Sequence, residues 1–245
     1  MVGLILGSAF GTEAAFGAVL GLAVEWGVKR GIYSNEAGQG TGPHPAAAAE
    51  VSHPAKQGYV QAFSVYVDTL LVCSATAFMI LSTGLYNVMD GAGNAIVEAL
   101  PGVEAGPGYT QAAVESFLPG WGAGFVAVAL LFFAFTTIVA YYYMAETNIA
   151  YINRRVQRPW MILLLPLGIL AAVTYGTVRS AGLAWALGDI GVGLMAWLNI
   201  VAILIIQRPA LKALKDYETQ KKAGKEPVFD PDALEIKNAD FWRKS

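Results

Sequence analysis

Two adjacent threonines in an uncharged apolar stretch are the first residues whose types and spacing could do chemistry. Thr136 and Thr137 lie within Phe133–Tyr141, and Thr137 and Tyr141 are four residues apart, so they share one face of a helix. Hydroxyls are hard oxygen donors, which suit a small alkali cation. The alternative is that each hydroxyl bonds back to a carbonyl of its own helix.

A polar segment rich in glycine, Arg30–Gly42, follows the first apolar stretch. It contains Asn35 and Gly38 and has Glu36 near its centre, and its glycines allow close backbone approach and unusual dihedral angles. A phosphate-binding loop is excluded because no Gly-Lys-Ser/Thr follows. The segment is either a tight loop joining two helices or a gate or re-entrant segment on a permeation path.

Small residues also recur in the apolar stretch that precedes this segment. Gly17, which follows Phe16, and Gly21 have the Gly-x-x-x-Gly spacing. This pattern favours either a close crossing of two helices or an interrupted helix whose freed backbone groups bind substrate or ion.

Asp68 is a carboxylate inside the second apolar stretch. It shares a helical face with Gln61 and Ser64. An aspartate well inside a membrane helix costs about 2.5–3.5 kcal/mol unless it is paired or hydrated. Asp68 is therefore either a hydrogen-bonded structural group or part of a functional site. Asp189 and Asn199, in the last apolar stretch, are expected to make hydrogen bonds between helices.

The composition excludes several classes of protein. Of 245 residues, 56% are hydrophobic and 14% are charged, against about 45–50% and about 25% in soluble domains. One cysteine excludes a disulfide scaffold, and a net charge of −2 gives no case for nucleic-acid binding. No nucleophile and base stand out, so we do not expect an enzyme.

We predict an all-α integral membrane protein whose helix bundle occupies residues 1–207. Membrane spans need about 20 mostly apolar residues. Five are predicted, at about 13–28, 58–85, 120–145, 160–177 and 183–206. A charged tail, 208–245, follows, in which Pro209 is expected to start a helix and Gly224 to end it.

The distribution of Lys and Arg sets the orientation. If the five spans alternate, the basic residues of the first loop, the third loop and the tail lie on one side, and the acidic segment 86–119 lies on the other. The basic side is then cytoplasmic. We expect a multi-pass protein of the cell inner (plasma) membrane with a cytoplasmic C-terminus.

Several of these motifs resemble those of one transporter family. The segment Gly27–Gly40, Asp68-Thr69 and Phe133–Thr137 are similar to motifs of the alanine/glycine:cation symporters, also called sodium:alanine symporters. The resemblance implies the leucine-transporter-like fold of the amino acid–polyamine–organocation (APC) superfamily, with two inverted repeats of five helices. Five spans equal one repeat, and their orientation fits the second. The chain thus resembles a C-terminal half that lacks the N-terminal repeat.

The resemblance also implies roles for the residues above. It places Phe16, Gly17 and Gly21 in a broken helix beside the substrate, with Thr137 and Tyr141. It places Thr136 and Thr137 at a sodium site. The residues themselves, rather than the resemblance, predict gate or structural roles for Asn35, Glu36, Gly38 and Asp68, since the glycines allow mobility and Glu36 is the one charge of segment 34–42.

The implied function is sodium-coupled symport of alanine or glycine, with sodium as the coupling ion and no other cofactor. A truncated, non-transporting membrane protein or subunit is the alternative. Whether sodium or a proton couples, and which small amino acid moves, stays open.

Overall fold

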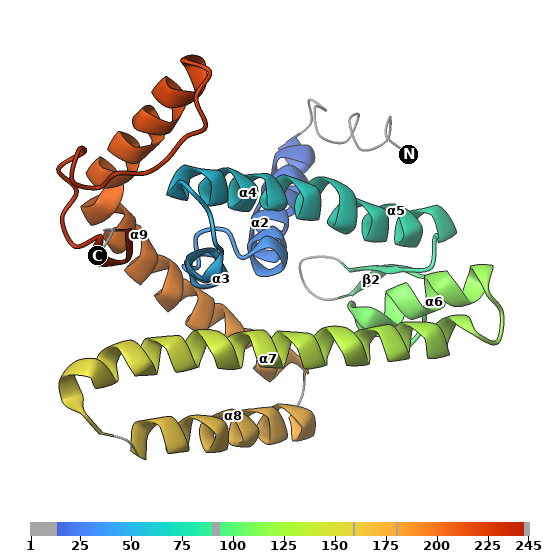
Figure 1. Cartoon of the computed structure of the whole chain (residues 1–245). Coiled ribbons are helices and arrows are strands. Elements are labelled where there is room, and N and C mark those ends of the chain that lie inside the picture. The colour runs from blue at the N-terminus through green and yellow to red at the C-terminus, as the bar shows by residue number, and fades with distance from the viewer. Residues whose placement is uncertain (1–13, 90–93, 159, 180, 243–245) are drawn as a thin grey trace. The chain divides into compact units, whose positions relative to one another are not determined.

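The computed structural model describes residues 14–89, 94–158, 160–179 and 181–242 (Figure 1). The side chains of residues 14–20, 22, 181 and 240 lie outside this description. The described residues are mainly helical, as the sequence predicts. They form two compact units, one made of residues up to Arg30 with Asp68–Leu170, the other of Gly31–Val67 with the residues from Ala171 onward.

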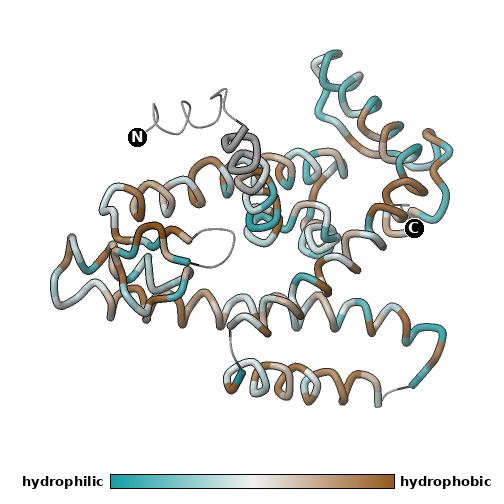
Figure 2. Tube along the Cα trace, turned by 180° about the vertical axis from the view of Figure 1, so that it is seen from behind, coloured by the Kyte–Doolittle hydropathy of each residue, from teal (hydrophilic) through white to brown (hydrophobic). Residues whose placement is uncertain are grey.

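Four helices are long and apolar enough to cross a membrane, which confirms an integral membrane protein. Among the described residues they are Pro54–Thr83, Gly122–Val156, Trp160–Val178 and Gly182–Lys222. They coincide with the second to fifth expected spans, and Figure 2 shows apolar residues along them. The helix at the first expected span, α2 (Ala14–Asn35), is not among the four, and its second half carries Glu25, Lys29 and Arg30. A count of five spans is therefore not established.

In the first unit, the second span continues through a π-helix, η1 (Asp68–Cys73), into α5 (Ser74–Thr83). Two short antiparallel strands follow, β1 (Asn87–Met89) and β2 (Ala95–Glu98), with Val88 opposite Val97. This hairpin is a small exception to the all-α prediction.

The turn between α6 (Pro107–Phe117) and α7 (Gly122–Val156) is tightly packed. The Glu115 carboxylate accepts backbone N–H bonds from Ala123, at 2.8 Å, and from Gly120. These bonds hold the pKa of Glu115 below its usual range, that from Ala123 having the largest effect. Glu115 thus supplies acceptors to N–H groups that the start of α7 leaves unpaired. The helix α8 (Trp160–Val178) follows α7.

The second unit contains α3 (Pro43–Ala48), α4 (Pro54–Val67) and α9 (Ala181–Lys222), together with the short helix η2 (Asp240–Trp242). The α9 helix passes through Pro209 without a break, so the prediction of a new helix starting there is wrong. A proline inside a helix removes one backbone hydrogen bond and costs about 3 kcal/mol, so Pro209 is a weak point of α9.

The predicted end of this helix is where the structure places it. Gly224 has φ +71°, and the Lys225 N–H donates to Gln220 O at 3.0 Å. This is the Schellman arrangement that glycine favours at a helix C-terminus. The chain after Gly224 runs back along the mostly hydrophilic end of α9 (Figures 1 and 2).

Candidate functional site

The predicted ion ligands lie near the middle of α7. The Thr136 hydroxyl lies 2.9 Å from Phe132 O and 3.1 Å from Phe133 O, so it donates to its own helix as the alternative interpretation expected. Donation uses the hydroxyl hydrogen and leaves oxygen lone pairs for a cation. Thr137 and Tyr141 are exposed in the described structure. The oxygen of Thr136 can therefore still accept a cation while its hydrogen bonds to the helix.

The predicted interruption of the first helix is absent from the described residues. The α2 helix is continuous from Ala14 to Asn35, and a single glycine costs only about 1 kcal/mol in a helix, too little to break it. No atom lies within 4 Å of the position that a Cβ would take at Gly21. The structure thus packs nothing in the described part of the chain against this point, while the side chain of Phe16 and the contacts of Gly17 lie outside that part.

The glycine-rich loop, Glu36–Gly42, closes the end of α2. The Glu36 N–H donates to Ile32 O at 2.9 Å, and Asn35 Oδ1 accepts the Ala37 N–H at 2.9 Å. Gly38 has φ +82°. Glu36 has φ +56°, a left-handed backbone conformation that residues other than glycine rarely adopt. The loop is a defined turn in which Glu36 is held in a strained backbone conformation.

This loop and the end of α2 contact α9 at two points. Tyr33 Oη donates to Asp189 Oδ1 at 2.6 Å, and Asn199 Nδ2 donates to Gly38 O at 2.9 Å. The ring of Tyr33 also packs edge-on against Trp185, with centroids 5.4 Å apart. The prediction of a hydrogen bond between helices is confirmed for Asp189, whose partner Tyr33 belongs to α2. It is wrong for Asn199, because Asn199 donates to a carbonyl of the loop.

Two side chains of the loop are buried. Gln39 is 3% exposed and donates from Nε2 to Ile32 O at 2.8 Å. Thr41 is 2% exposed, and its hydroxyl oxygen has no hydrogen-bond partner among the described residues. Burial of a hydroxyl without a partner is unfavourable by about 1–3 kcal/mol. The loop is therefore well packed, but one of its buried polar groups lacks a hydrogen-bond partner among the described residues.

Asp68 begins η1, a feature that the sequence interpretation did not foresee. The Cys73 thiol lies 3.8 Å from Asp68 Oδ2, across the five-residue spacing that a π-helix brings together. The Asp68 side chain is half-buried in the described structure. Because π-helical turns are frequent at functional sites, this turn is consistent with either role left open for Asp68.

A cluster around His53 was also missed. His53 is fully buried, its Nδ1 accepts the Ala55 N–H at 3.1 Å, and its Nε2 lies 3.3 Å from Asp216 Oδ2. Since Nδ1 accepts, the neutral ring carries its proton on Nε2. Burial lowers the pKa of His53, and Asp216 partly opposes this. The sequence signal was Pro54, which favours the first helical position and so makes His53 an N-cap.

The segment that follows α9 makes hydrogen bonds and a ring contact with the cluster around His53. Ser52 Oγ donates to Pro227 O at 2.8 Å, and the Phe229 N–H donates to Ser52 O at 2.9 Å. The Phe229 ring packs against the His53 ring with centroids 5.3 Å apart. Lys56 and Glu226 form an ion pair. Residues far apart in the sequence thus meet at one end of α4 and α9.

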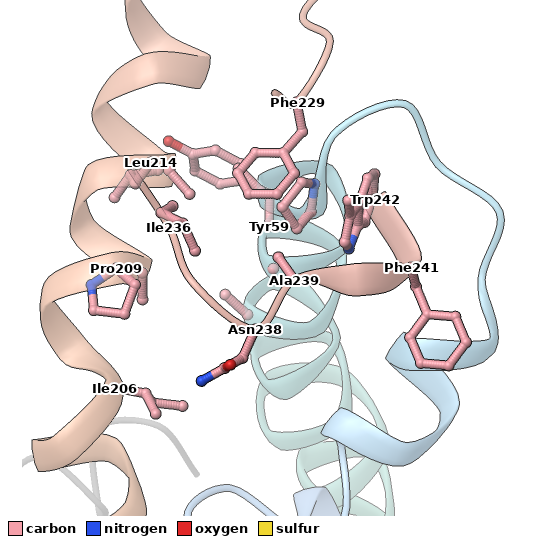
Figure 3. A pocket seen from close by; sticks show the side chains of 16 residues that line it. Tyr59, Ile206, Pro209, Leu214, Phe229, Ile236, Asn238, Ala239, Phe241 and Trp242 are labelled. Carbon is pink, nitrogen blue, oxygen red and sulfur yellow. The ribbon is translucent and has the colours of Figure 1, made fainter. Parts of the chain in front are cut away.

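An apolar cavity of about 730 Å³ adjoins this cluster (Figure 3). The start of α4, the region of α9 around Pro209 and the segment Ile236–Trp242 contribute its walls. Most of the lining residues are small or aliphatic, and four are aromatic, namely Tyr59, Phe229, Phe241 and Trp242.

These features define an integral membrane protein with polar groups held between helices and loops. The chain belongs to the sodium:alanine symporter family, whose sequence pattern matches residues 1–231. It is 68% identical over its whole length to the putative sodium/proton-dependent alanine carrier protein YrbD of Bacillus subtilis, covering 50% of that protein. It is 62% identical to the sodium/proton-dependent alanine carrier protein of Bacillus sp. PS3, with 98% of this chain and 54% of that protein covered.

A more distant relative is the sodium/alanine symporter AgcS of Methanococcus maripaludis. It is 32% identical, with 90% of this chain and 45% of that protein covered. The chain spans about half the length of the curated relatives it matches. No solved structure matches it.

Proposed function

We propose that this chain is the C-terminal half of a secondary transporter that couples sodium to the uptake of alanine or glycine. The observation that carries the proposal is the 68% identity, over the whole of this chain, to a protein named as an alanine carrier. The runner-up is a truncated, non-transporting membrane protein or subunit.

The proposed architecture is the second five-helix repeat of a leucine-transporter-like fold, with α2 as the additional span. Its supports are the four membrane-length helices and their exposed faces. Phe133 is 69% exposed and Leu198 is 74% exposed in the described structure. Apolar area of this kind is stable against lipid or against another part of a transporter, and unfavourable in water.

We assign the sodium site to the hydroxyls of Thr136 and Thr137. The Thr136 hydroxyl already directs its hydrogen toward carbonyls of its own helix, which orients its lone pairs outward. The substrate site takes Phe16, Gly17, Gly21, Thr137 and Tyr141. Because Thr137 belongs to both sites, bound sodium would order the substrate site, and by linkage each ligand would raise the affinity for the other by the same factor.

The proposed gate comprises Asn35, Glu36 and Gly38, with Asp68 as a gate or structural residue. The strained Glu36 and the unsatisfied Thr41 hydroxyl support a loop with more than one position. The protein lies in the inner (plasma) membrane, with the bundle at 1–207 and the tail, 208–245, in the cytoplasm. Its basic loops support this orientation.

Sodium titration of alanine uptake tests the proposal. The complete transporter is placed in liposomes, and Thr136→Val and Thr137→Val are compared with Thr177→Val, whose hydroxyl bonds within α8. Loss of a ligand to a charged group costs about 1.5–3 kcal/mol, so the sodium midpoint should rise by about tenfold or more. If both variants keep the parent's midpoint, the hydroxyls are not ligands.

The same assay addresses the runner-up. Liposomes that hold this chain without the proposed first repeat should show no sodium-dependent accumulation of labelled alanine, because half of the ion and substrate contacts would be missing. Accumulation by this chain alone would show that the half is sufficient. A complete transporter that accumulates no alanine would leave the non-transporting subunit as the better interpretation.

A further inference from the structure

We propose that Asp189 and Asn199 are positioning residues that hold the glycine-rich loop on α9, and that release of the loop from Asn199 opens the gate. The inference rests on the proposed transport function and adds residues of α9 to the gate. Its basis is the pair of contacts described above, one at each end of a short segment. Tyr33 lies at the end of α2, and Gly38 lies within the loop.

The two contacts differ in strength. The 2.6 Å bond from Tyr33 Oη to Asp189 has the length of a hydroxyl donating to a carboxylate, a class about twice as strong as neutral bonds. The 2.9 Å bond from the Asn199 amide to Gly38 O joins two neutral groups. The first contact therefore suits a fixed end, and the second suits an end that is released.

Small residues make both contacts possible. A Cβ at Gly188 would lie 2.9 Å from Tyr33 Oη, and a Cβ at Gly40 would lie 3.2 Å from Asn199 Cγ. Gly40 also has φ +85°, which a residue with a side chain rarely adopts. Glycine thus occupies the place where the loop meets Asn199 for two independent reasons, namely space and backbone conformation.

The docked loop also carries unfavourable features that release could relieve. Glu36 is held at φ +56°, and the Thr41 hydroxyl is buried without a partner among the described residues. Strain and unsatisfied polar groups persist where surrounding contacts overdetermine them. The bond from Asn199 to Gly38 O is one of the contacts that hold the loop in this position. Weakening Asn199 should therefore shift the population toward the released loop.

Hydrogen–deuterium exchange on the complete transporter in lipid measures the attachment directly. We expect Asn199→Ala to raise amide exchange across residues 36–42 about fivefold, the factor that corresponds to one neutral hydrogen bond. Gln207→Ala is the matched control, since the Gln207 amide donates to Leu204 O within the same helix. Exchange equal to that of the control would overturn the attachment.

Tyr33→Phe provides a second variant that removes one hydroxyl and keeps the ring beside Trp185. It should raise exchange at residues 31–36 more than at 38–42, because it loosens the other end of the segment. The same pattern in both variants would contradict the assignment of a fixed end and a releasable end.

Measurement of alanine transport shows whether the contact acts in a gate or only stabilises the loop. A cytoplasmic loop that releases more easily favours the inward-open state, so Asn199→Ala should raise the KM for external alanine up to about fivefold. Raised exchange with an unchanged KM would refute the gate role. If the parent transports no alanine, the proposed function fails, while the exchange data still decide the attachment.

Discussion

The buried His53 and the half-buried Asp216 form a histidine–carboxylate pair, 163 residues apart in the sequence, with Nε2 3.3 Å from Oδ2. The other ring nitrogen accepts the Ala55 N–H, so both nitrogens have partners. Gln220 extends the pair, since its Nε2 donates to Asp216 Oδ2 at 2.7 Å and to Val228 O at 2.9 Å. One hydrogen-bonded network thus links α4, α9 and the segment that follows α9.

The first prediction concerns the pH dependence of this network. The pKa of His53 is below its ordinary value of 6.5 in the folded protein, chiefly because of burial, so the unfolded chain binds more protons near and below that pH. The contribution of His53 to stability is therefore present above pH 6.5 and is lost as the pH falls. Limited proteolysis of residues 226–242 should accelerate at pH 5.5 relative to pH 7.5.

His53→Gln should flatten this pH dependence. His44→Gln, at the chain's other histidine, should leave it intact. Asp216 and Lys56 are the charged groups that act on His53, and both stay in place in these variants. An identical pH profile in the parent and in His53→Gln would show that another group titrates.

The second prediction separates a packed aromatic residue from an exposed one in the same segment. Phe229 is 8% exposed and packs against His53 and Trp242, whereas Phe241 is 92% exposed. Phe229→Ala should destabilise the docked segment by about 3–5 kcal/mol, and Phe241→Ala should change its stability little. Thermal unfolding and proteolysis of the segment would measure both, and equal effects would contradict the observed packing.

The third prediction tests how closely the turn between α6 and α7 is packed. It compares alanine substitutions at two glycines of α7, one in contact with α6 and one not. A Cβ at Gly122 would lie 2.4 Å from the backbone nitrogen of Glu115, and nothing lies within 4 Å of that position at Gly124. Gly122→Ala should force the helices apart and lower the melting temperature. Gly124→Ala should be neutral or stabilise by up to about 1 kcal/mol, because alanine favours helix. A tolerated Gly122→Ala would show that the turn packs less closely.

The fourth prediction separates charge from backbone strain at Glu36. Glu36→Gly relieves a left-handed conformation that costs other residues about 1–2 kcal/mol, so it should stabilise the docked loop. Glu36→Gln keeps the strain and removes the charge, so it should slow alanine uptake by the complete transporter only if the charge acts in the gate. Expression and melting temperature serve as controls, and unchanged kinetics in both variants would leave Glu36 with a structural role.

Apolar length was the part of the fold that could be predicted from the sequence. The expected span 160–177 corresponds to Trp160–Val178, because uninterrupted apolar residues identify such a helix without tertiary information. Helix ends were harder to predict. Pro209 satisfies the pattern of a helix start, yet α9 continues through it, since the turns on either side favour continuation.

The candidate sites were predictable to different degrees. The bond between Asp189 and another helix could be predicted, because a polar group inside a span is costly unless it has a partner. That Asn199 would bond to a loop carbonyl could not be predicted in this way. The partners of His53 did not, because Asp216 and Phe229 reach it only through the tertiary fold. The π-helix at Asp68–Cys73 was missed because the periodicity was interpreted as α-helical throughout.

The continuity of α9 has a mechanical consequence. A helix of 42 residues is about 63 Å long, roughly twice the hydrocarbon thickness of about 30 Å, so about half of it extends beyond the membrane core. Figure 1 shows that α9 changes direction between its two halves. A tilt of the embedded half would therefore reach Gln220, where the His53 network is attached, only as far as this bend stays rigid.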